Sequence, residues 1–258
     1  MKIALLGYGK MGHMIEVEAK KKGFEISATI DSYAKDASHF ISSPADIVAA
    51  LQETKSEVVI DFTHPDAAFE NIKAIIPLGI PLVVGTTGWL SHLSEVQDLV
   101  AKHSSSLFYA ANFSIGVNLF YKVVAEAAKV FSSYDDYDVA LWEAHHNQKA
   151  DSPSGTALEL AKLVLKNHSG KTEMHFDAFH EKPKAHQLHV SSTRCGSVPG
   201  THTVFFDSNA DSIELLHRAR SREGFALGAV HAASWLFDGL KKGSVQKGRV
   251  YTMEDMLS

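Results

Sequence analysis

The sequence predicts an α/β protein, with a doubly wound parallel sheet in its first half and a smaller α+β domain in its second half. Three observations support this prediction. Apolar strand-like segments alternate with amphipathic helical segments over residues 1–112, which is typical of a parallel sheet covered by helices on both faces. A glycine-rich turn joins the first strand to the first helix. After residue 112, period-two segments follow one another without helices, which indicates a mixed or antiparallel sheet.

The first half contains five apolar strands and three helices. We predict the strands at residues 3–6, 26–30, 58–60, 82–84 and 107–111. The helices are predicted at 11–22, from Pro65 onward and at 90–102. Gly23 is expected to end the first helix, because glycine readily adopts the left-handed conformation that follows many helices. Right-handed crossovers between the parallel strands make such a sheet doubly wound.

The second half begins with a long helix at 117–131, followed by a strand at 139–142 and a helix at 153–166. Period-two segments come next, at residues 175–179, 188–193, 203–206 and 213–217. An apolar helix at 224–240 is expected to pack back on the first domain. We therefore divide the chain into a first domain at 1–112, a second domain at 113–222 and a returning segment at 223–258.

Composition excludes several classes of protein. A chain of 258 residues with 45% hydrophobic residues is long enough to bury a core. Its net charge of -5 does not indicate the basic surface that binds nucleic acid, and its apolar runs are too short to span a membrane. The single cysteine, Cys195, excludes a disulfide within the chain and fits a reducing compartment. Because no signal-peptide pattern follows Met1, we expect a cytoplasmic protein with no nucleic-acid or membrane partner.

The glycine-rich turn has the spacing GxGxxG, formed by Gly7, Gly9 and Gly12. The first glycine permits a tight turn, the second lets a pyrophosphate approach the backbone, and the third lets helix and strand pack closely. Together with Lys10 and Met11, the turn places free N–H groups at the positive end of a helix, where phosphates bind. We predict that residues 1–112 form a Rossmann-type nucleotide-binding domain for NADH or NADPH. A glycine turn without a ligand is the alternative.

Asp31 ends the second strand, where a carboxylate accepts hydrogen bonds from an adenosine ribose. It favours NADH weakly, because a 2′-phosphate would meet a like charge and Ser32 supplies no cation. Lys10 and Lys35 favour NADPH instead, because a lysine attracts the 2′-phosphate. Ligands of open α/β sheets bind beyond the carboxyl ends of strands. We therefore expect further cofactor contacts at Gly85, Thr86, Thr87, Ala110, Ala111, Asn112 and Phe113, although each turn taken alone also fits an ordinary strand end.

The segment at 142–157, WEAHHNQKADSPSGTA, combines acid/base and cationic groups. A strand delivers His145, His146 and Lys149 into a loop. Histidine titrates near neutrality and can give a proton, and lysine offers a point charge for a carboxylate. The segment therefore predicts a proton donor beside a carboxylate-binding group.

A helix follows this loop, with Ser152 as its expected N-cap and Pro153 at its first position. Gly155 and Thr156 then fall in the first turn, whose N–H groups lack intrahelical partners. Such a helix start is an anion receptor, which suits a substrate that carries carboxylates.

Two other interpretations of this segment stay open. His145 and His146 are a possible metal pair, but neighbours on a strand point to opposite faces. No Cys, His or Asp cluster nearby in the sequence completes a metal-like spacing, so we expect no metal. The second interpretation is a capped helix that follows surface histidines without any catalytic role.

The same segment resembles the signature of 4-hydroxy-tetrahydrodipicolinate reductases, of the form E-x-H-H-x-x-K-x-D-x-P-S-G-T-A. The resemblance covers the whole chain, through DFT at 61–63, GTTG at 85–88, ANFSIGVN at 111–118, RCG at 194–196, GTH at 200–202 and SR at 221–222. It implies the NADH- or NADPH-dependent reduction of 4-hydroxy-tetrahydrodipicolinate, a cyclic imine dicarboxylate, to tetrahydrodipicolinate in lysine and diaminopimelate biosynthesis. It also implies that residues 113–222 bind the substrate and assemble a homotetramer.

The resemblance further implies a role for individual residues. His145 corresponds to the proton donor and Lys149 to a second catalytic residue, while His146, Gly155 and Thr156 correspond to substrate-carboxylate contacts. The cofactor contacts fall on the glycine turn and the strand-end residues named above. In the implied reaction the substrate loses water, hydride adds at C4, and His145 protonates the resulting enamine. Domain closure about the segments near 112 and 222 is expected to accompany the reaction.

Some positions depart from the family pattern. Gln148 stands where some members carry a further histidine, and Thr201 stands where glutamate is frequent. Ser32 replaces an arginine that is common in NADPH-using members, and the pattern leaves the role of Arg222 undefined. The rival interpretations are another two-domain dehydrogenase, acting on an amino acid or a sugar, and a nucleotide-sensing regulator without activity. The intact histidine and lysine of the 142–157 segment argue against the regulator.

Overall fold

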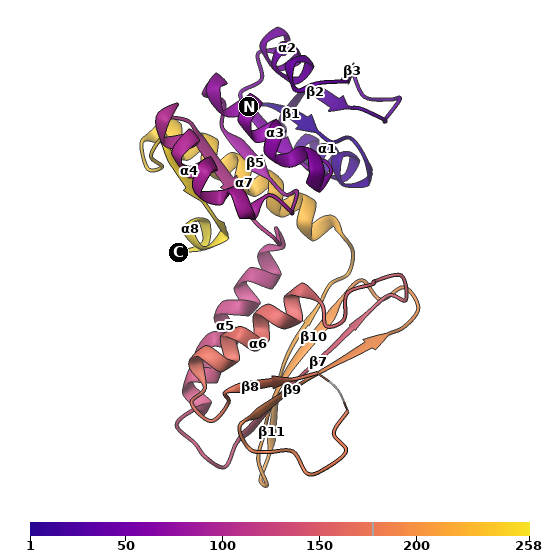
Figure 1. The fold of residues 1–258 in the computed structure, drawn as a ribbon, viewed down its shortest axis with the longest axis vertical. Helices are drawn as coiled ribbons and strands as arrows, with labels where there is room; N and C mark the ends of the chain where they lie inside the picture. Colours follow the sequence, from indigo (N-terminus) through magenta and orange to yellow (C-terminus); the bar gives the residue numbers. More distant parts are fainter. Residues whose placement is uncertain (177) are drawn as a thin grey trace. The chain divides into compact units, whose positions relative to one another are not determined.

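The computed structural model describes residues 1–176 and 178–258, and the chain divides into two compact units. The first unit contains Met1–Ser114 with Glu223–Ser258, and the second contains Ile115–Arg222. Each unit has its own sheet and its own helices (Figure 1). Within the described ranges, no helix is both long enough and apolar enough to cross a membrane.

The first unit is built on a parallel seven-stranded sheet with the order β3-β2-β1-β4-β5-β6-β12. Its strands are β1 (Lys2–Leu6), β2 (Glu25–Asp31), β3 (His39–Phe40), β4 (Val58–Asp61), β5 (Leu82–Val84), β6 (Ser106–Tyr109) and β12 (Arg249–Tyr251). The order reverses beside β1, so the predicted doubly wound sheet is confirmed. The two edge strands β3 and β12 were not predicted, because each is short and includes a polar residue, so neither forms an apolar run.

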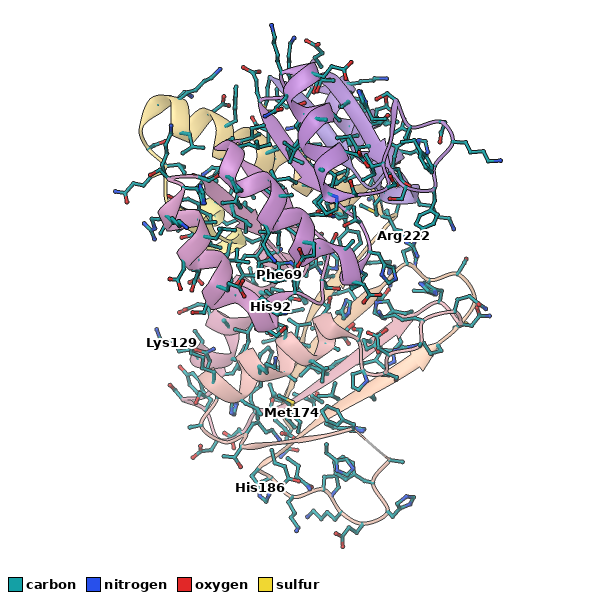
Figure 2. All side chains as sticks on the ribbon, turned by 45° about the horizontal axis from the view of Figure 1, so that its top comes forward. Phe69, His92, Lys129, Met174, His186 and Arg222 are labelled. Atoms are coloured by element: carbon teal, nitrogen blue, oxygen red, sulfur yellow. The ribbon has the colours of Figure 1, made fainter. Side chains whose placement is uncertain are left out.

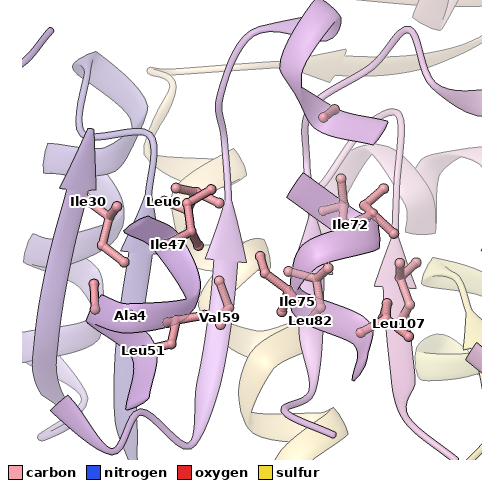
Figure 3. Packing of buried hydrophobic residues seen from close by; sticks show 14 of the residues in the cluster. Ala4, Leu6, Ile30, Ile47, Leu51, Val59, Ile72, Ile75, Leu82 and Leu107 are labelled. Carbon is pink, nitrogen blue, oxygen red and sulfur yellow. The ribbon is translucent and has the colours of Figure 1, made fainter. Parts of the chain in front are cut away.

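Helices cover both faces of this sheet. On one face, α2 (Pro44–Thr54), α3 (Pro65–Ile75) and α4 (Leu93–Lys102) contribute buried side chains such as Ile47, Ile72 and Val96 to one apolar cluster. Alternate strand residues such as Leu6 and Val59 complete this cluster (Figure 3). On the other face, α1 (Lys10–Lys21) packs against α7 (Glu223–Lys242), which also lies on β4, β5 and β6. The short helices η1 (Ile76–Leu78), η2 (Leu90–His92) and α8 (Met253–Leu257) complete the unit.

The second unit contains a mixed sheet with the order β11-β10-β7-β9-β8. Its elements are α5 (Ile115–Phe131), β7 (Asp138–His145), α6 (Gly155–Asn167), β8 (Glu173–His175), β9 (Gln187–Arg194), β10 (Thr201–Asp207) and β11 (Ser212–Arg218). β9 pairs in parallel with β7 and β8, and β10 pairs antiparallel with β7 and β11. The predicted mixed sheet is therefore confirmed. The strand expected at 175–179 lies earlier, at Glu173–His175, and Asp177 falls outside the described residues.

One face of this second sheet is covered by α5 and α6, which lie side by side (Figure 1). Val124 of α5 and Leu160 of α6 share a buried cluster with alternate strand residues such as Leu141, Val190 and Val204. The period of two along each strand places Trp142 and Phe205 on the opposite face. The covered face also carries the polar residues at the carboxyl end of β7, which form the second part of the candidate site.

Candidate active site

The glycine turn follows β1 and is closely packed. Gly7 has a φ of 89°, and a Cβ there would overlap the carbonyl of Phe62 in the loop after β4. A Cβ on Gly12 would overlap the carbonyl of Gly7, so the start of α1 lies directly on the turn. A Cβ on Gly9 would meet no atom within 4 Å. The first and third glycines therefore serve packing, while Gly9 faces the open space that a pyrophosphate requires.

The N-terminus of α1 has backbone donors that would suit such a phosphate. The first intrahelical bond of this helix runs from the amide of His13 to the carbonyl of Gly9, at 3.0 Å. The amides of Lys10, Met11 and Gly12 precede that bond, and α1 has no acidic residue in its first turn. These N–H groups and the exposed Lys10 form a positively polarised end that fits an anionic cofactor.

Asp31, at the end of β2, is tied to the glycine turn. Its carboxylate accepts the amides of Tyr8 and Tyr33, both at 2.6 Å, and that of Ala34 at 2.9 Å. Burial alone would raise the pKa of Asp31, but these backbone donors lower it below its ordinary value. Asp31 is therefore an ionised carboxylate in a defined orientation beside the turn, as a ribose partner requires.

A buried carboxylate organises the loops after β4 and β5. Asp61 is fully buried and accepts the amide and hydroxyl of Thr63, at 2.9 and 2.7 Å, and the hydroxyl of Thr86 at 3.0 Å. Asn71 of α3 adds a fourth donor at 3.3 Å. Because the Thr86 hydroxyl donates its hydrogen to Asp61, this side chain could only accept a hydrogen bond from a cofactor.

The remaining predicted cofactor residues lie at the carboxyl ends of β5 and β6. Gly85 packs against the ring of Phe62, where a Cβ would overlap the aromatic carbons. Phe113 is buried, with its ring 5.7 Å from that of Phe62, and Asn112 accepts the amide of Ser114 at 2.9 Å. Thr87, Ala110 and Ala111 also lie after β5 and β6, at the carboxyl ends of strands. Ligands of open α/β sheets bind at these ends.

In the second unit, β7 places Glu143 and His145 on one face because they are two residues apart. Both are buried, and Nδ1 of His145 is hydrogen-bonded to the Glu143 carboxylate. The other carboxylate oxygen accepts Nη1 of Arg194, on the parallel neighbour β9, at 2.9 Å. Burial would raise the pKa of Glu143, but its hydrogen bonds, that of His145 first, outweigh burial and lower the pKa to about 2. Glu143 is an ionised acceptor, so Nδ1 of His145 carries the hydrogen.

His202 approaches the same pair from β10, where it lies directly opposite Glu143. Its ring is 4% exposed and stands edge-on to His145, with centroids 5.1 Å apart. Burial, and the nearby His145, lower the pKa of His202 to about 3, so this imidazole is neutral. Its Nε2 lies 3.2 Å from the hydroxyl of Ser154.

The sequence shows no metal-like spacing, but the fold brings three possible ligands together. One ligand atom each from Glu143, His145 and His202 lies within 4.8 Å of the others. The sequence hides this cluster because the antiparallel pairing of β7 and β10 brings distant residues together. Glu143, however, is already paired with the Arg194 guanidinium, whose charge opposes a cation at this position.

The loop after β7 carries the other predicted residues. The Lys149 ammonium forms an ion pair with Asp151 at 2.8 Å, and this bond lowers the pKa of Asp151. The amide of Lys149 donates to the carbonyl of His146 at 3.2 Å, which folds the loop into a turn. Lys149 is a quarter exposed, so its charge is accessible to an anion that displaces Asp151.

The start of α6 lies two residues later than predicted. Its N-cap is Ser154 rather than Ser152, because the Ser154 backbone is extended and its hydroxyl accepts the amide of Ala157 at 3.2 Å. Pro153 follows a cis peptide bond and precedes the helix. Gly155 and Thr156 are nevertheless in the first turn, as predicted, and a Cβ on Gly155 would meet only open space.

Four residues of this site had no role in the sequence prediction. Glu143 carried a usable signal, because its spacing from His145 is the strand period. Arg194, His202 and Ser154 gave no such signal, since only the strand register and the helix cap bring them to Glu143.

The fold and the two sets of residues define a class of protein. A doubly wound sheet with a glycine turn for a dinucleotide, followed by a unit with a buried imidazole beside a helix N-terminus, is typical of two-domain nicotinamide-dependent oxidoreductases.

Two protein-family sequence models match this chain and together span nearly all of it. The model of the dihydrodipicolinate reductase N-terminus matches residues 1–113, and that of the C-terminus matches residues 116–257. The chain belongs to the dihydrodipicolinate reductase family.

Similar proteins agree with this assignment. The 4-hydroxy-tetrahydrodipicolinate reductase of Christiangramia forsetii is 39% identical over 258 residues, covering 100% of this chain and 98% of the relative. That of Methanococcoides burtonii is 34% identical, covering 96% and 95%. The dipicolinate-bound dihydrodipicolinate reductase of Paenisporosarcina sp. TG-14 has the same fold, with a TM-score of 0.77 at 21% identity over 100% and 99% of the chains. An amine dehydrogenase of Mycobacterium smegmatis shares the fold at a TM-score of 0.60 and 9% identity, covering 92% of each chain.

Proposed function

We propose that this protein reduces 4-hydroxy-tetrahydrodipicolinate to tetrahydrodipicolinate, as the names of its relatives state for them. One observation carries the proposal: the β7–α6 segment places a buried, carboxylate-bound imidazole beside a helix start and a lysine. The test is oxidation of NADH or NADPH by the purified protein in the presence of freshly made dihydrodipicolinate synthase product.

His145 is the proton donor in this proposal. Its Nδ1 is committed to Glu143, so Nε2 is the atom from which a proton reaches the substrate. Lys149 exchanges Asp151 for a substrate carboxylate, and His146 with the amides of Gly155 and Thr156 receives that carboxylate. When bound, NADH or NADPH supplies the hydride. Substitution of Lys149 by alanine should raise KM and lower kcat, whereas an effect on cofactor affinity alone would assign Lys149 to a different site.

NADH is used at least as well as NADPH in this proposal. The ionised Asp31 suits a ribose 2′-hydroxyl and repels a 2′-phosphate, and Ser32 adds no cation. The exposed Lys10 and Lys35 reduce this preference, since a tenfold ratio is only about 1.4 kcal/mol. Comparison of kcat/KM for the two cofactors tests the proposal, and Ser32→Arg should shift the ratio toward NADPH. A preference of the unmodified protein for NADPH of about tenfold or more would contradict it.

The protein works as a homotetramer in the cytoplasm, with its second sheet as the interface. Leu216, Thr203, Trp142 and Ser191 are register partners across four strands, on the face opposite the α5–α6 cluster. Leu216 is 50% exposed, and an exposed apolar side chain on this face suits contact with a second copy of the chain. The free Cys195 as the sole cysteine fits a reducing cytoplasm.

A further inference from the structure

Glu143 lies at the centre of the hydrogen bonds in the second unit. It is 1% exposed, and its carboxylate has three donors from three different segments. Nδ1 of His145 binds one oxygen, while Nη1 of Arg194 and the amide of Ser154 bind the other at 2.9 and 3.3 Å. A buried carboxylate is stable only with such compensation, so these bonds define where each donor lies.

The bond to His145 determines what this imidazole can do. With Nδ1 committed to Glu143, the ring presents Nε2, and Gly200 leaves room there: a Cβ at Gly200 would lie 3.0 Å from that nitrogen. The other charged or titratable groups around this ring are Arg194 on β9 and His202 on β10, with Lys149 in the following loop. Glu143 is the carboxylate that is hydrogen-bonded to the ring.

The other two bonds hold the carboxylate receptor. The Ser154 amide donates to Glu143 while the Ser154 hydroxyl caps α6, so the carboxylate sets the position of the first helical turn. Arg194 donates through Nη2 to the carbonyl of Asp151 at 2.5 Å, which secures the loop that carries Lys149. Removal of the Glu143 charge would therefore affect both the proton donor and the anion-binding turn.

We propose that Glu143 is a positioning residue that orients His145 for proton donation and holds the N-terminus of α6 for the substrate carboxylate. This inference rests on the proposed reductase function. It assigns no contact between Glu143 and the substrate. The residue acts through His145, Ser154 and Arg194.

The test is a double-mutant cycle with Glu143→Gln and His145→Gln. Glu143→Gln should lower kcat roughly 10–10³-fold, raise KM and change the pH–rate profile, with cofactor affinity unchanged. The double variant should lose less in kcat than the product of the two single losses, because part of the effect of Glu143 passes through His145. Glu173→Gln is the matched control, since Glu173 pairs with His186 at 3.4 Å on the exposed side of β8 (His186 is labelled in Figure 2). Losses that multiply in the double variant, or an unchanged pH profile, would overturn the inference.

A second measurement does not depend on turnover. Nitrogen-15 NMR of the histidines, with His145 assigned by its loss in His145→Gln, should show Nδ1 protonated in the unmodified protein and a changed pattern in Glu143→Gln. If Glu143→Gln does not fold, Glu143→Asp replaces it and should retain the pH profile at a lower kcat. A His145 signal in folded Glu143→Gln that matches that of the unmodified protein would contradict the inference, as would a changed pH profile in Glu143→Asp. Absence of turnover in the unmodified protein, with the NMR result as expected, would contradict only the proposed function.

Discussion

At the scale of single residues, the proposed reaction depends on proton donation by His145. Its substitution by glutamine removes the proton donor but keeps a polar side chain in the same volume. We expect kcat to fall roughly 10²–10⁴-fold while NADH affinity, measured by fluorescence titration, stays unchanged. His186→Gln is the control, because His186 is half-exposed and pairs with Glu173 on β8. A His145→Gln enzyme with near-normal kcat would remove this residue from the mechanism.

The glycine turn allows a prediction that separates packing from binding. Gly9 has a φ of -82° and open space around its missing Cβ, so Gly9→Ala should fold normally. The added methyl would occupy the space assigned to the pyrophosphate, and we expect NADH affinity to fall at least about tenfold, or about 1.4 kcal/mol.

Gly12→Ala is the matched comparison. Its Cβ would overlap the carbonyl of Gly7, so this variant should lower Tm as well as cofactor affinity. Thermal unfolding and fluorescence titration of both variants distinguish the two effects. Normal NADH affinity in Gly9→Ala would place the phosphates elsewhere.

At the scale of elements, His202 on β10 makes stability depend on pH. Its pKa in the folded protein is about 3, below the value of 6.5 expected for the unfolded chain. The unfolded chain therefore takes up a proton first as the pH falls, and the folded state loses stability below about pH 6.5. The contribution of this one group approaches 1.4 kcal/mol per pH unit between the two pKa values.

Replacing His202 by glutamine removes this titration. Urea unfolding between about pH 7 and pH 5 should give a free energy of unfolding that falls less steeply with decreasing pH in His202→Gln than in the unmodified protein. Other histidines with lowered pKa values, such as His168 and His217, stay in both proteins, so the difference isolates His202. Parallel pH dependences would mean that His202 does not change its proton occupancy on folding.

Several helices and strands could be predicted from the sequence alone. Strands such as β4 and β9 were predicted to within two residues at each end, because apolar runs and period-two alternation are local properties. The helix α2 was missed, although Ser43 and Asp46 form a capping box with Pro44 at its first position. That pattern is a detectable signal for a helix start.

Other features were beyond a single sequence. Ser152 and Ser154 are both acceptable N-caps by residue type, and only the backbone conformation selects Ser154. The meeting of His202 with Glu143 depends on the register between β7 and β10, which composition does not determine. The identities of His145 and Lys149 were predicted from their segment, but the carboxylate that orients the imidazole was identified only from the structure.

At the scale of the whole molecule, the row across the second sheet predicts how copies assemble. Leu216→Lys places a charge in the proposed interface while it leaves the α5–α6 cluster untouched. We expect light scattering to give a mass near four times 28.2 kDa for the unmodified protein and a smaller mass for this variant. Val17→Lys, at a position of similar exposure on α1 of the first unit, should leave the mass unchanged. An unmodified protein that is monomeric would contradict the proposed tetramer.

We propose that this protein is a nicotinamide-dependent reductase of 4-hydroxy-tetrahydrodipicolinate, in which His145 donates the proton to the substrate. The most direct measurement follows NADH and NADPH absorbance when freshly made dihydrodipicolinate synthase product is added to the purified protein and to His145→Gln. We expect rapid oxidation of at least NADH by the unmodified protein, and a rate lower by roughly 10²–10⁴-fold in the variant. No oxidation of either cofactor by the unmodified, folded protein, or equal rates for the two proteins, would contradict it.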